Sequence, residues 1–278
     1  MTYPCNETLA INISPLTSAE FEKFRVLIYQ HAGIDLTPAK HPMVANRLAK
    51  RLTHYNLKTY TDYYQLATHT DHTNEFQTLV NILSTNETYF FREAQHFSYL
   101  KNEILARWKG NNFRVWSAAS SSGEEAYSLA MVLADTLGSR QWKVYGTDVS
   151  TTVLKVAEQA IYPMNRLDNM PASFLEKYAE KGVHSQRGHF RINEELRHKV
   201  SFGEANLMQA IPPHLNKFDV IFLRNILIYF DNETKKSVLN RVVQTLNIGG
   251  HLFVSHTENI ASLVVGLEKV SPSVFIKK

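Results

Sequence analysis

The sequence predicts an α/β protein with a doubly wound parallel sheet, preceded by an all-helical domain and interrupted by a small antiparallel insertion. Three observations lead to this prediction. Residues 18–83 follow a helical period without strand alternation. From residue 113 onward, apolar strand signals alternate with helical segments, as in a doubly wound sheet. Between residues 161 and 196, prolines and glycines break that alternation, which indicates an insertion.

The composition is that of an ordinary globular protein. With 278 residues, 44% hydrophobic and 20% charged, the chain is long enough for one large and one small domain. Its single cysteine, Cys5, excludes a disulfide framework and a thiolate metal cluster, which suits a reducing compartment. The N-terminus lacks a secretory pattern and no run reaches about 20 apolar residues, so we expect a cytoplasmic protein without direct membrane insertion.

The helical domain is expected over residues 1–85. Its first helix, SAEFEKFRVLIYQHAG, begins with Ser18 as its cap and ends at Gly33. The helical period then continues to residue 83, and no strand pattern interrupts it. We therefore expect a bundle of short helices ahead of the α/β domain.

Basic residues gather on one helix of this domain. The net charge is +4, yet the stretch between Asp35 and Asp62 contains no acidic residue. Within it, Arg47, Lys50 and Arg51 recur at helical spacing, which places them on one helix face. Two interpretations remain open for this face: a solvated surface, or a docking surface for an acidic partner.

The α/β domain is expected over residues 86–278. Its five predicted strands cover 113–117, 143–147, 199–203, 219–223 and 251–255. Residues 268–276 alternate around a proline and predict an edge or hairpin strand. The insertion is placed at about residues 162–198, where HFRI is a short strand candidate in a small antiparallel sheet.

The turn after the first strand is typical of a nucleoside site. In VWSAASSSGEEAYSLAMVL the strand runs into small residues, which let a ligand approach the backbone at a helix N-terminus. The next strand ends at Asp148, at the edge where open parallel sheets bind ligands, and an acid there suits ribose hydroxyls. The turn has one glycine where a dinucleotide site has three, which argues against a pyrophosphate. A nucleoside without pyrophosphate, such as S-adenosylmethionine, fits better.

Four sequence blocks resemble the CheR-type chemotaxis receptor glutamate methyltransferases. They are NETYFFREAQHF from Asn86, WSAASSSGEEAYSLAM from Trp116, GTDVS from Gly146, and FDVIFLRNILIYFD from Phe218 with GGHLFVSHTEN from Gly249. The resemblance also includes the helical domain and the insertion. It implies a Rossmann-like methyltransferase that moves a methyl group from S-adenosylmethionine to receptor glutamate carboxylates, leaving S-adenosylhomocysteine and glutamyl methyl esters.

The resemblance also implies which residues form the site. Cofactor contacts are assigned to Asn86, Thr88, Arg92, Glu124, Asp148, Asn206, Leu207, Arg224 and Asn225. Catalytic roles are assigned to Arg92, at the methionine carboxylate, and to Tyr229, beside the transferring methyl group. Arg224 and Asn225 interrupt an apolar run at the carboxyl end of a buried strand, where unpaired polar residues are costly, so a site role is favoured.

Several assignments have structural alternatives when only the residues are considered. Asn86 and Thr88 are able to cap a helix that bears the phenylalanines after them, and Arg92 is able to pair with a surface acid. The stretch SSGE that ends at Glu124 is itself a capping-box pattern. Both interpretations stay open for these four residues.

Asp148, Asn206 and Tyr229 have alternatives too. Asp148 can cap the next helix, but Ser150 is better placed to do so, which leaves Asp148 available for the ribose. Asn206 can form its own turn, and Tyr229 can be a core tyrosine with a satisfied hydroxyl.

The histidines do not predict a metal centre. The sequence has 12 of them but no H-E-x-x-H or comparable cluster with carboxylates, so we predict no metal. His256 and Glu258 lie where a strand is expected to meet the cleft, and we expect them to support the residues that touch the ligands.

The expected partners follow from the resemblance. They are the cytoplasmic helical region of chemotaxis receptors and, in part of the family, a receptor C-terminal peptide at the β-subdomain. A monomer that does not bind nucleic acid is expected. Two other functions stay open: a nucleic-acid methyltransferase, suggested by a pI near 9.0, and a catalytically silent S-adenosylmethionine-binding sensor or adaptor.

Overall fold

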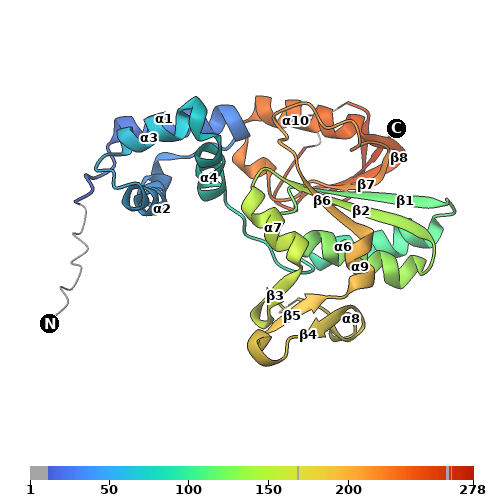
Figure 1. Cartoon of the computed structure of the whole chain (residues 1–278). Coiled ribbons are helices and arrows are strands. Elements are labelled where there is room, and N and C mark those ends of the chain that lie inside the picture. Colours follow the sequence, from blue (N-terminus) through green and yellow to red (C-terminus); the bar gives the residue numbers. More distant parts are fainter. Residues whose placement is uncertain (1–11, 168, 261–262, 264) are drawn as a thin grey trace. The chain divides into compact units, whose positions relative to one another are not determined.

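The computed structural model describes residues 12–278 except 168, 261–262 and 264, so Cys5 lies outside the described residues. The chain forms two compact units, Met1–Thr85 and Asn86–Lys278 (Figure 1). None of the helices in the described residues is long and apolar enough to cross a membrane.

The first unit is all-helical. Its α-helices are α1 (Ser18–Ala32), α2 (His41–His54), α3 (Tyr60–Thr68) and α4 (Thr73–Leu83), joined by 3₁₀ turns at Pro38–Lys40 and Thr70–His72. The predicted cap at Ser18 is wrong by one residue. Thr17 is the cap, because its hydroxyl accepts from the Glu20 N–H while the Glu20 carboxylate accepts from the Thr17 N–H. The end of α1 at Gly33 is confirmed, in the left-handed conformation that glycine favours.

A buried carboxylate ties α2, α3 and α4 together. Glu75 on α4 accepts two hydrogen bonds from the Arg51 guanidinium, at 2.9 and 2.6 Å. It also accepts from the hydroxyls of Tyr63 and Tyr55, at 2.7 and 2.9 Å. Around this cluster the apolar faces of the helices pack together, with Phe24 and other side chains fully buried.

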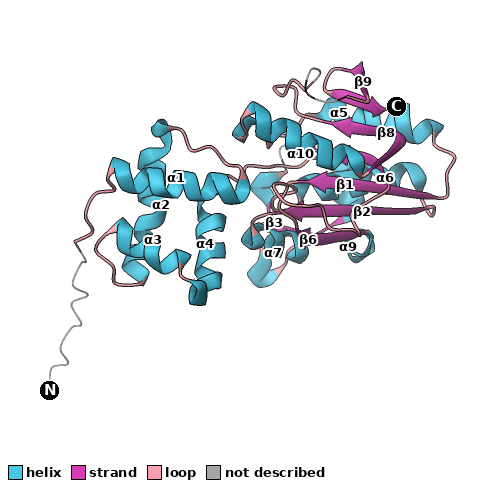
Figure 2. Cartoon of the chain, turned by 90° about the horizontal axis from the view of Figure 1, so that it is seen from above, coloured by secondary structure: helices cyan, strands magenta, loops and turns pink. Residues whose placement is uncertain are grey.

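The described residues of the second unit form a seven-stranded sheet in the order β6-β2-β1-β7-β8-β10-β9 (Figure 2). Its strands are β1 (Asn112–Ala118), β2 (Gln141–Asp148), β6 (Val200–Glu204), β7 (Phe218–Phe222), β8 (Leu246–Phe253), β9 (Leu267–Ser271) and β10 (Val274–Lys277). The five strands from β6 to β8 in the sheet order are parallel to one another. Strand β10 pairs antiparallel with β8 on one side and with β9 on the other. The five predicted strands and the terminal hairpin are confirmed.

Helices cover both faces of this sheet. The α-helices are α5 (Ala94–Tyr99), α6 (Glu124–Leu137), α7 (Thr151–Gln159), α8 (Ala172–Tyr178), α9 (Glu194–Lys199) and α10 (Asn232–Gln244). Short turns are π-helical at Leu100–Ile104 and 3₁₀ at Leu105–Arg107, Met164–Arg166, His184–Gln186 and Leu227–Tyr229. In Figure 1, α10 lies on one side of the sheet and α6 and α7 on the other.

Alternating side chains of β1 belong to two hydrophobic cores, one on each face of the sheet. Phe113 and Val115 pack with the residues of α6, whereas Trp116 and Ala118 pack with those of α10. This period of two is the pattern of a strand that is buried on both faces. It explains why the strand is rich in apolar residues and could be predicted from the sequence, although the buried Ser117 is polar.

The predicted insertion is confirmed as a three-stranded antiparallel sheet. Its strands β3 (Ile161–Pro163), β5 (His189–Ile192) and β4 (Ala179–Lys181) lie in that order. Phe190 faces inward and packs against Phe90 and Tyr162, while the neighbouring positions on β5 are exposed. The aromatic contacts anchor the insertion to the core of the larger unit.

Candidate cofactor and catalytic site

The carboxyl ends of the parallel strands gather most of the predicted site residues. The strand order reverses between β1 and β7, because β2 and β6 lie on one side of β1 and β7 and β8 on the other. In an open parallel sheet, ligands bind at such a switch point. The loops that follow β1, β2, β6, β7 and β8 therefore meet at one edge.

The small-residue turn after β1 is held by its backbone. Ala119, Ser121 and Gly123 all have positive φ, and the Ser120 N–H donates to the Thr147 carbonyl at 2.8 Å. At Gly123, where φ is +95°, a Cβ atom would lie 2.8 Å from the Ala157 Cβ on α7. Glycine is thus required for the close packing of the turn on α7, as well as for its conformation.

Asp148 lies at the centre of this edge. Its two carboxylate oxygens accept from the N–H groups of Ser121 and Ser150, both at 2.9 Å. Ser150 occupies the N-cap position of α7, as predicted, but its side chain makes no cap hydrogen bond. Asp148 is 7% exposed, and burial raises its pKa. The Val149 N–H donates to the same carboxylate, so three of its four lone pairs are used and one stays available for a ligand hydroxyl.

The NET segment that begins at Asn86 is pinned beside this turn. The Asn86 carbonyl accepts from the Ser121 hydroxyl at 3.1 Å, and the Thr88 carbonyl accepts from Arg166 at 2.7 Å. The alternative that Asn86 and Thr88 cap a helix is wrong, since α5 begins at Ala94 with Glu93 in the cap position.

Arg92 folds back over this segment. Its Nη1 donates to the Glu87 carbonyl at 2.9 Å, and its guanidinium lies over the Tyr89 ring, 5.5 Å from the centroid. Among the described residues, Arg92 has no acidic partner within salt-bridge distance. The alternative of a surface ion pair is therefore not what the structure contains.

Glu124 is almost completely buried. It is 1% exposed, accepts from the Ser122 hydroxyl at 2.6 Å and lies 3.9 Å from the Arg166 guanidinium. The capping-box alternative is wrong, because Gly123 is the cap residue of α6 and makes no side-chain cap. Burial raises the pKa of Glu124. A cofactor ammonium would reach this carboxylate only by displacing part of its packing.

Arg224, at the end of β7, is committed to an internal network. Its Nε donates to Glu125 Oε2 at 2.7 Å and its Nη1 to the Arg92 carbonyl at 2.7 Å. Nη1 also lies 3.0 Å from His96 Nδ1 and 3.6 Å from Glu93 Oε2. These contacts satisfy the buried guanidinium, so it holds the site together from within the protein.

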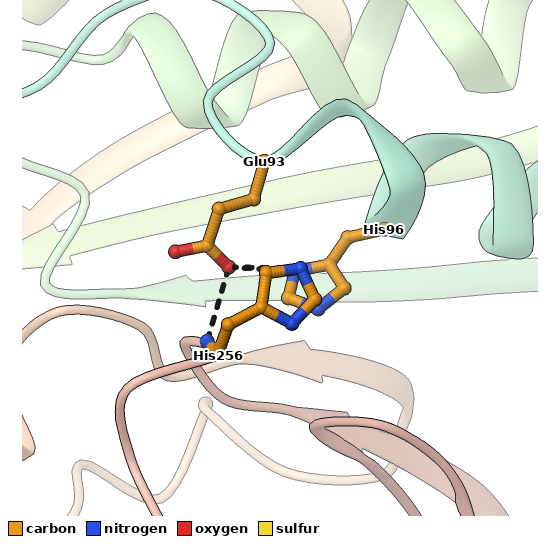
Figure 3. A group of neighbouring side chains, drawn as sticks. All are labelled: Glu93, His96 and His256. Carbon is orange, nitrogen blue, oxygen red and sulfur yellow. Dashed lines mark hydrogen bonds and ion pairs between the residues drawn. The ribbon is translucent and has the colours of Figure 1, made fainter.

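The sequence analysis missed a cluster of possible metal ligands, Glu93, His96 and His256 (Figure 3). Their ligand atoms lie within 4.8 Å of one another; Glu93 and His96 have the spacing of a Glu-x-x-His motif, whereas His256 is distant in the sequence. Arg224 already supplies a positive charge here and occupies the lone pair of His96 Nδ1. Burial, with Arg224 second, lowers the pKa of His96 to about 3, so the imidazole is neutral. A neutral imidazole can ligate a metal, but the charge of Arg224 and its contact with Nδ1 disfavour a cation here, and the absence of a metal stays a prediction.

The loop after β6 approaches Asp148. The Ala205 N–H donates to the Asp148 carbonyl at 3.2 Å, and Asn206 Oδ1 accepts from the Met208 N–H at 2.9 Å. The turn alternative for Asn206 is therefore present in the structure. Leu207 is buried, and its carbonyl accepts two hydrogen bonds from Arg241, at 3.1 and 2.7 Å.

The loop after β7 carries Asn225 and Tyr229. Asn225 has a φ of +58°, and its Nδ2 donates to the Ser255 hydroxyl at 2.9 Å. Tyr229 is half-buried in the turn Leu227–Tyr229, and its hydroxyl makes no hydrogen bond with the described residues. A core tyrosine would have its hydroxyl satisfied, so this alternative is not supported.

Comparison with known proteins decides the family. The "CheR methyltransferase, SAM binding domain" family matches residues 86–275, and the "CheR methyltransferase, all-alpha domain" family matches residues 19–84. The chain belongs to the CheR methyltransferase family. It is an S-adenosylmethionine-dependent methyltransferase, and the predicted Rossmann-like fold with its helical N-terminal domain is confirmed.

Curated relatives of this CheR-family protein match most of its length. It is 41% identical over 266 residues to the chemotaxis protein methyltransferase of Escherichia coli (strain K12), covering 94% of this chain and 92% of the relative. It is 39% identical to chemotaxis protein methyltransferase 2 of Pseudomonas aeruginosa, covering 87% of both chains. It is 33% identical to the chemotaxis protein methyltransferase of Borreliella burgdorferi, covering 96% of both chains.

The residues around Asp148 fit the cofactor of the CheR family. The hydroxyls of Ser120 and Ser150 are buried beside Asp148 and have no hydrogen-bond partner among the described residues. Such unpaired buried groups are uncommon in folded proteins and indicate a missing polar partner. Ribose hydroxyls would supply one, and one of them matches the lone pair that Asp148 retains.

Two of the three basic side chains predicted to dock a partner on α2 are already bound within the helical unit of this CheR-family protein. Arg47 donates to the carbonyls of Ile82 and Ser84 at the end of α4, at 2.9 and 3.0 Å, and Arg51 is paired with Glu75. Lys50 is exposed and has no polar contact among the described residues. Of the three predicted docking residues, Lys50 therefore offers its charge most freely.

Proposed function

We propose that this CheR-family methyltransferase esterifies glutamate side chains in the helical cytoplasmic region of chemotaxis receptors. The observation that carries the proposal is that one chain contains both the cofactor domain and the all-helical domain of this family. The names of the relatives, which are chemotaxis protein methyltransferases over nearly their full length, support the same partner. The basic α2 supports an acidic substrate.

The reaction is a direct displacement. S-Adenosylmethionine supplies a methyl group on a positively charged sulfur. A receptor carboxylate oxygen forms the new O–C bond as the S–C bond breaks, and the electron pair of that bond stays on sulfur. Because a glutamate carboxylate is already ionised near pH 7, the step requires no general base. Alignment and exclusion of water are then the contributions left to the protein.

The proposed roles follow the geometry of the edge. Asp148 holds a ribose hydroxyl through its remaining lone pair, with Asn206 and Leu207 beside the adenine in the neighbouring loop. Arg92 faces the methionine carboxylate with those N–H groups that do not bind the Glu87 carbonyl. Asn86 and Thr88 line the same end, while Glu124 is a candidate for the ammonium group.

Tyr229 is proposed to orient the reacting groups. Its hydroxyl lacks a partner among the described residues, and the turn that carries it ends at the same sheet edge as the ribose site. A hydroxyl there can donate to the incoming carboxylate or lie against the transferring methyl group. Asn225 supports the cofactor side of this loop through its backbone.

The receptor is proposed to dock through charge. Lys50 contacts an acidic receptor helix, and Arg47 adds its charge from a more fixed position. A receptor C-terminal peptide is proposed to dock at the three-stranded sheet β3-β5-β4, whose exposed positions on β5 carry His189 and Arg191. Both contacts lie in the cytoplasm, where we place the enzyme.

Mass spectrometry tests the chemistry of the product. A receptor cytoplasmic fragment incubated with the protein and S-adenosylmethionine is digested, and peptides heavier by one methyl group are sequenced. We expect the methyl groups on glutamate side chains. Methyl groups on lysine or arginine, or transfer to RNA that falls steeply with salt, would contradict the proposal.

A further inference from the structure

The carboxylate of Glu258, which lies in the loop after β8, accepts hydrogen bonds from backbone N–H groups of its own loop and of the loop after β7. Its Oε2 accepts from the Ser255 N–H at 2.8 Å and from the Asn225 N–H at 3.1 Å. Its Oε1 accepts from the Leu227 N–H at 2.8 Å, and the Ile228 N–H adds a further hydrogen bond. Glu258 is 8% exposed, so all of this carboxylate's contacts lie inside the protein.

Three of these donors belong to the loop that carries Tyr229. Asn225 reverses the chain in the left-handed conformation, and the turn Leu227–Tyr229 follows. The first N–H groups of such a turn have no partner within the turn itself. Glu258 supplies that partner from a different loop, in the way that a carboxylate caps a helix.

A second chain of hydrogen bonds braces the same loop. Asn225 Nδ2 donates to the Ser255 hydroxyl at 2.9 Å, and that hydroxyl donates to Glu93 Oε1 at 2.7 Å. Glu93 directly follows Arg92, whose carbonyl accepts from Arg224. The loops after β7 and β8 and the segment before α5 are thus joined into one unit.

We infer that Glu258 is a positioning residue for Tyr229: its carboxylate fixes the turn Leu227–Tyr229, and through it the placement of the Tyr229 side chain. The inference rests on the proposed function, because it takes Tyr229 to act on the reacting groups. Neither oxygen of Glu258 is available to the ligands, since its four backbone donors use all four lone pairs of the carboxylate. A residue of this kind acts on the reaction only through the loop it holds.

A double-mutant cycle separates positioning from general support of the fold. The chains compared are wild type, E258Q, Y229F and the double variant, with E268Q on the exposed β9 edge as the matched control. Glutamine keeps the shape of Glu258 but turns an N–H group toward backbone donors. We expect E258Q to lower kcat by about 10- to 100-fold, since small misplacements of reacting groups have such effects.

The decisive result is the effect of E258Q in the Y229F background. If Glu258 acts through Tyr229, E258Q lowers kcat there by less than about twofold, because the interaction is already lost. Calorimetry is expected to give a Kd for S-adenosylhomocysteine within about threefold of wild type, and E268Q is expected to change neither value. Equal losses of kcat in both backgrounds, or an unchanged kcat, would overturn the inference.

A second measurement does not depend on activity. A nitroxide label is attached at Ile228→Cys in a C5S chain, since Ile228 is 52% exposed and Cys5 is the single cysteine. E258Q, or E258D if the glutamine variant unfolds, is expected to increase label mobility, whereas E268Q is not. Unchanged mobility would overturn the inference. Lack of transfer by the wild-type chain would instead count against the proposed function.

Discussion

Arg224 and Glu125 form a buried ion pair in which Arg224 Nε lies 2.7 Å from Glu125 Oε2. Glu125 also accepts from the Ser117 hydroxyl at 2.7 Å, so the pair joins the end of β7 to β1 and to the first turn of α6. Its Arg224 partner holds the Arg92 carbonyl as well. Two strands, a helix and the Arg92 segment therefore depend on one guanidinium.

The first prediction concerns the stability that Arg224 provides. Arg224→Met leaves a buried carboxylate and a buried carbonyl without their donor, so we expect a loss of about 3 to 5 kcal/mol in the free energy of unfolding. Urea denaturation measures it. Arg107→Met is the control, because its pair with Glu103 is exposed and worth about 1 kcal/mol or less. A variant of normal stability that binds no S-adenosylhomocysteine would make Arg224 a direct ligand instead.

His96 predicts a dependence of stability on pH. The pKa of His96 is lowered to about 3 by burial and then by Arg224, against an ordinary value near 6.5. Between these two pH values, His96 is protonated in the unfolded chain but neutral in the folded one. The free energy of unfolding therefore decreases as pH falls from about 6.5 toward 3. The slope due to this proton is at most about 1.4 kcal/mol per pH unit.

Denaturation midpoints measured between pH 7 and pH 5 check this prediction. We compare wild type with His96→Gln, in which Glu93 and His256 are retained, so the difference between the two slopes reports His96 alone. We expect a flatter profile for the variant. Parallel profiles would mean that His96 titrates normally in the folded protein.

Asp148 is predicted to bind the ribose. Asp148→Asn removes the charge that accepts the ribose hydroxyls, and hydrogen bonds to charged groups contribute about 1.5 to 3 kcal/mol, so affinity for S-adenosylhomocysteine should fall about 10- to 100-fold. Calorimetry measures the Kd. Asp135→Asn, an acid that pairs with Lys101 and Lys177, should leave it unchanged. Equal Kd values for the Asp148 variant and wild type would exclude the ribose role.

Tyr229 is predicted to act in the transfer step. Tyr229→Phe removes only the hydroxyl, so we expect kcat to fall while the Kd for S-adenosylhomocysteine stays within about threefold of wild type. Steady-state kinetics and calorimetry together test this split. Loss of cofactor binding with an unchanged kcat at saturation would place Tyr229 among the binding residues.

The basic helix gives a prediction that separates docking from stability. Lys50→Glu should raise the KM for the receptor by about threefold or more and leave cofactor affinity unchanged. Arg51→Met should instead lower stability, because Glu75 would lose its buried partner. An unchanged KM for the Lys50 variant would remove α2 from the docking surface.

Much of the fold could be predicted because short stretches of the sequence, through their hydrophobic periodicity and their turn residues, indicate the strands and helices. The core-facing positions of β1 are apolar except Ser117, and the small residues after the strand mark the turn. The candidate site could be located for the same reason, since Asp148 is the last residue of β2 and Asn225 lies three residues after the end of β7. Proline and glycine breaks likewise marked the insertion around β5.

The partners of the side chains could not be predicted, because they lie far apart in the sequence. Arg224 and Glu125 are separated by 99 residues, so nothing local indicates that Arg224 is used internally. Arg51 meets Glu75 across 24 residues, which turns an apparent docking charge into a core contact. The hydrogen bond from the Ser121 N–H to Asp148 could not be predicted either, because the two residues are 27 positions apart.

The most direct test of the account is the fate of labelled methyl groups. Tritiated S-adenosylmethionine, the protein and a chemoreceptor cytoplasmic fragment are incubated, and the receptor is then treated with mild base. We predict release of radioactive methanol, which a methyl ester gives and methylated amines or nucleobases do not, and its loss when the receptor glutamates are replaced by alanine. Receptor label that resists base, or no label although the protein binds S-adenosylmethionine, would contradict the account.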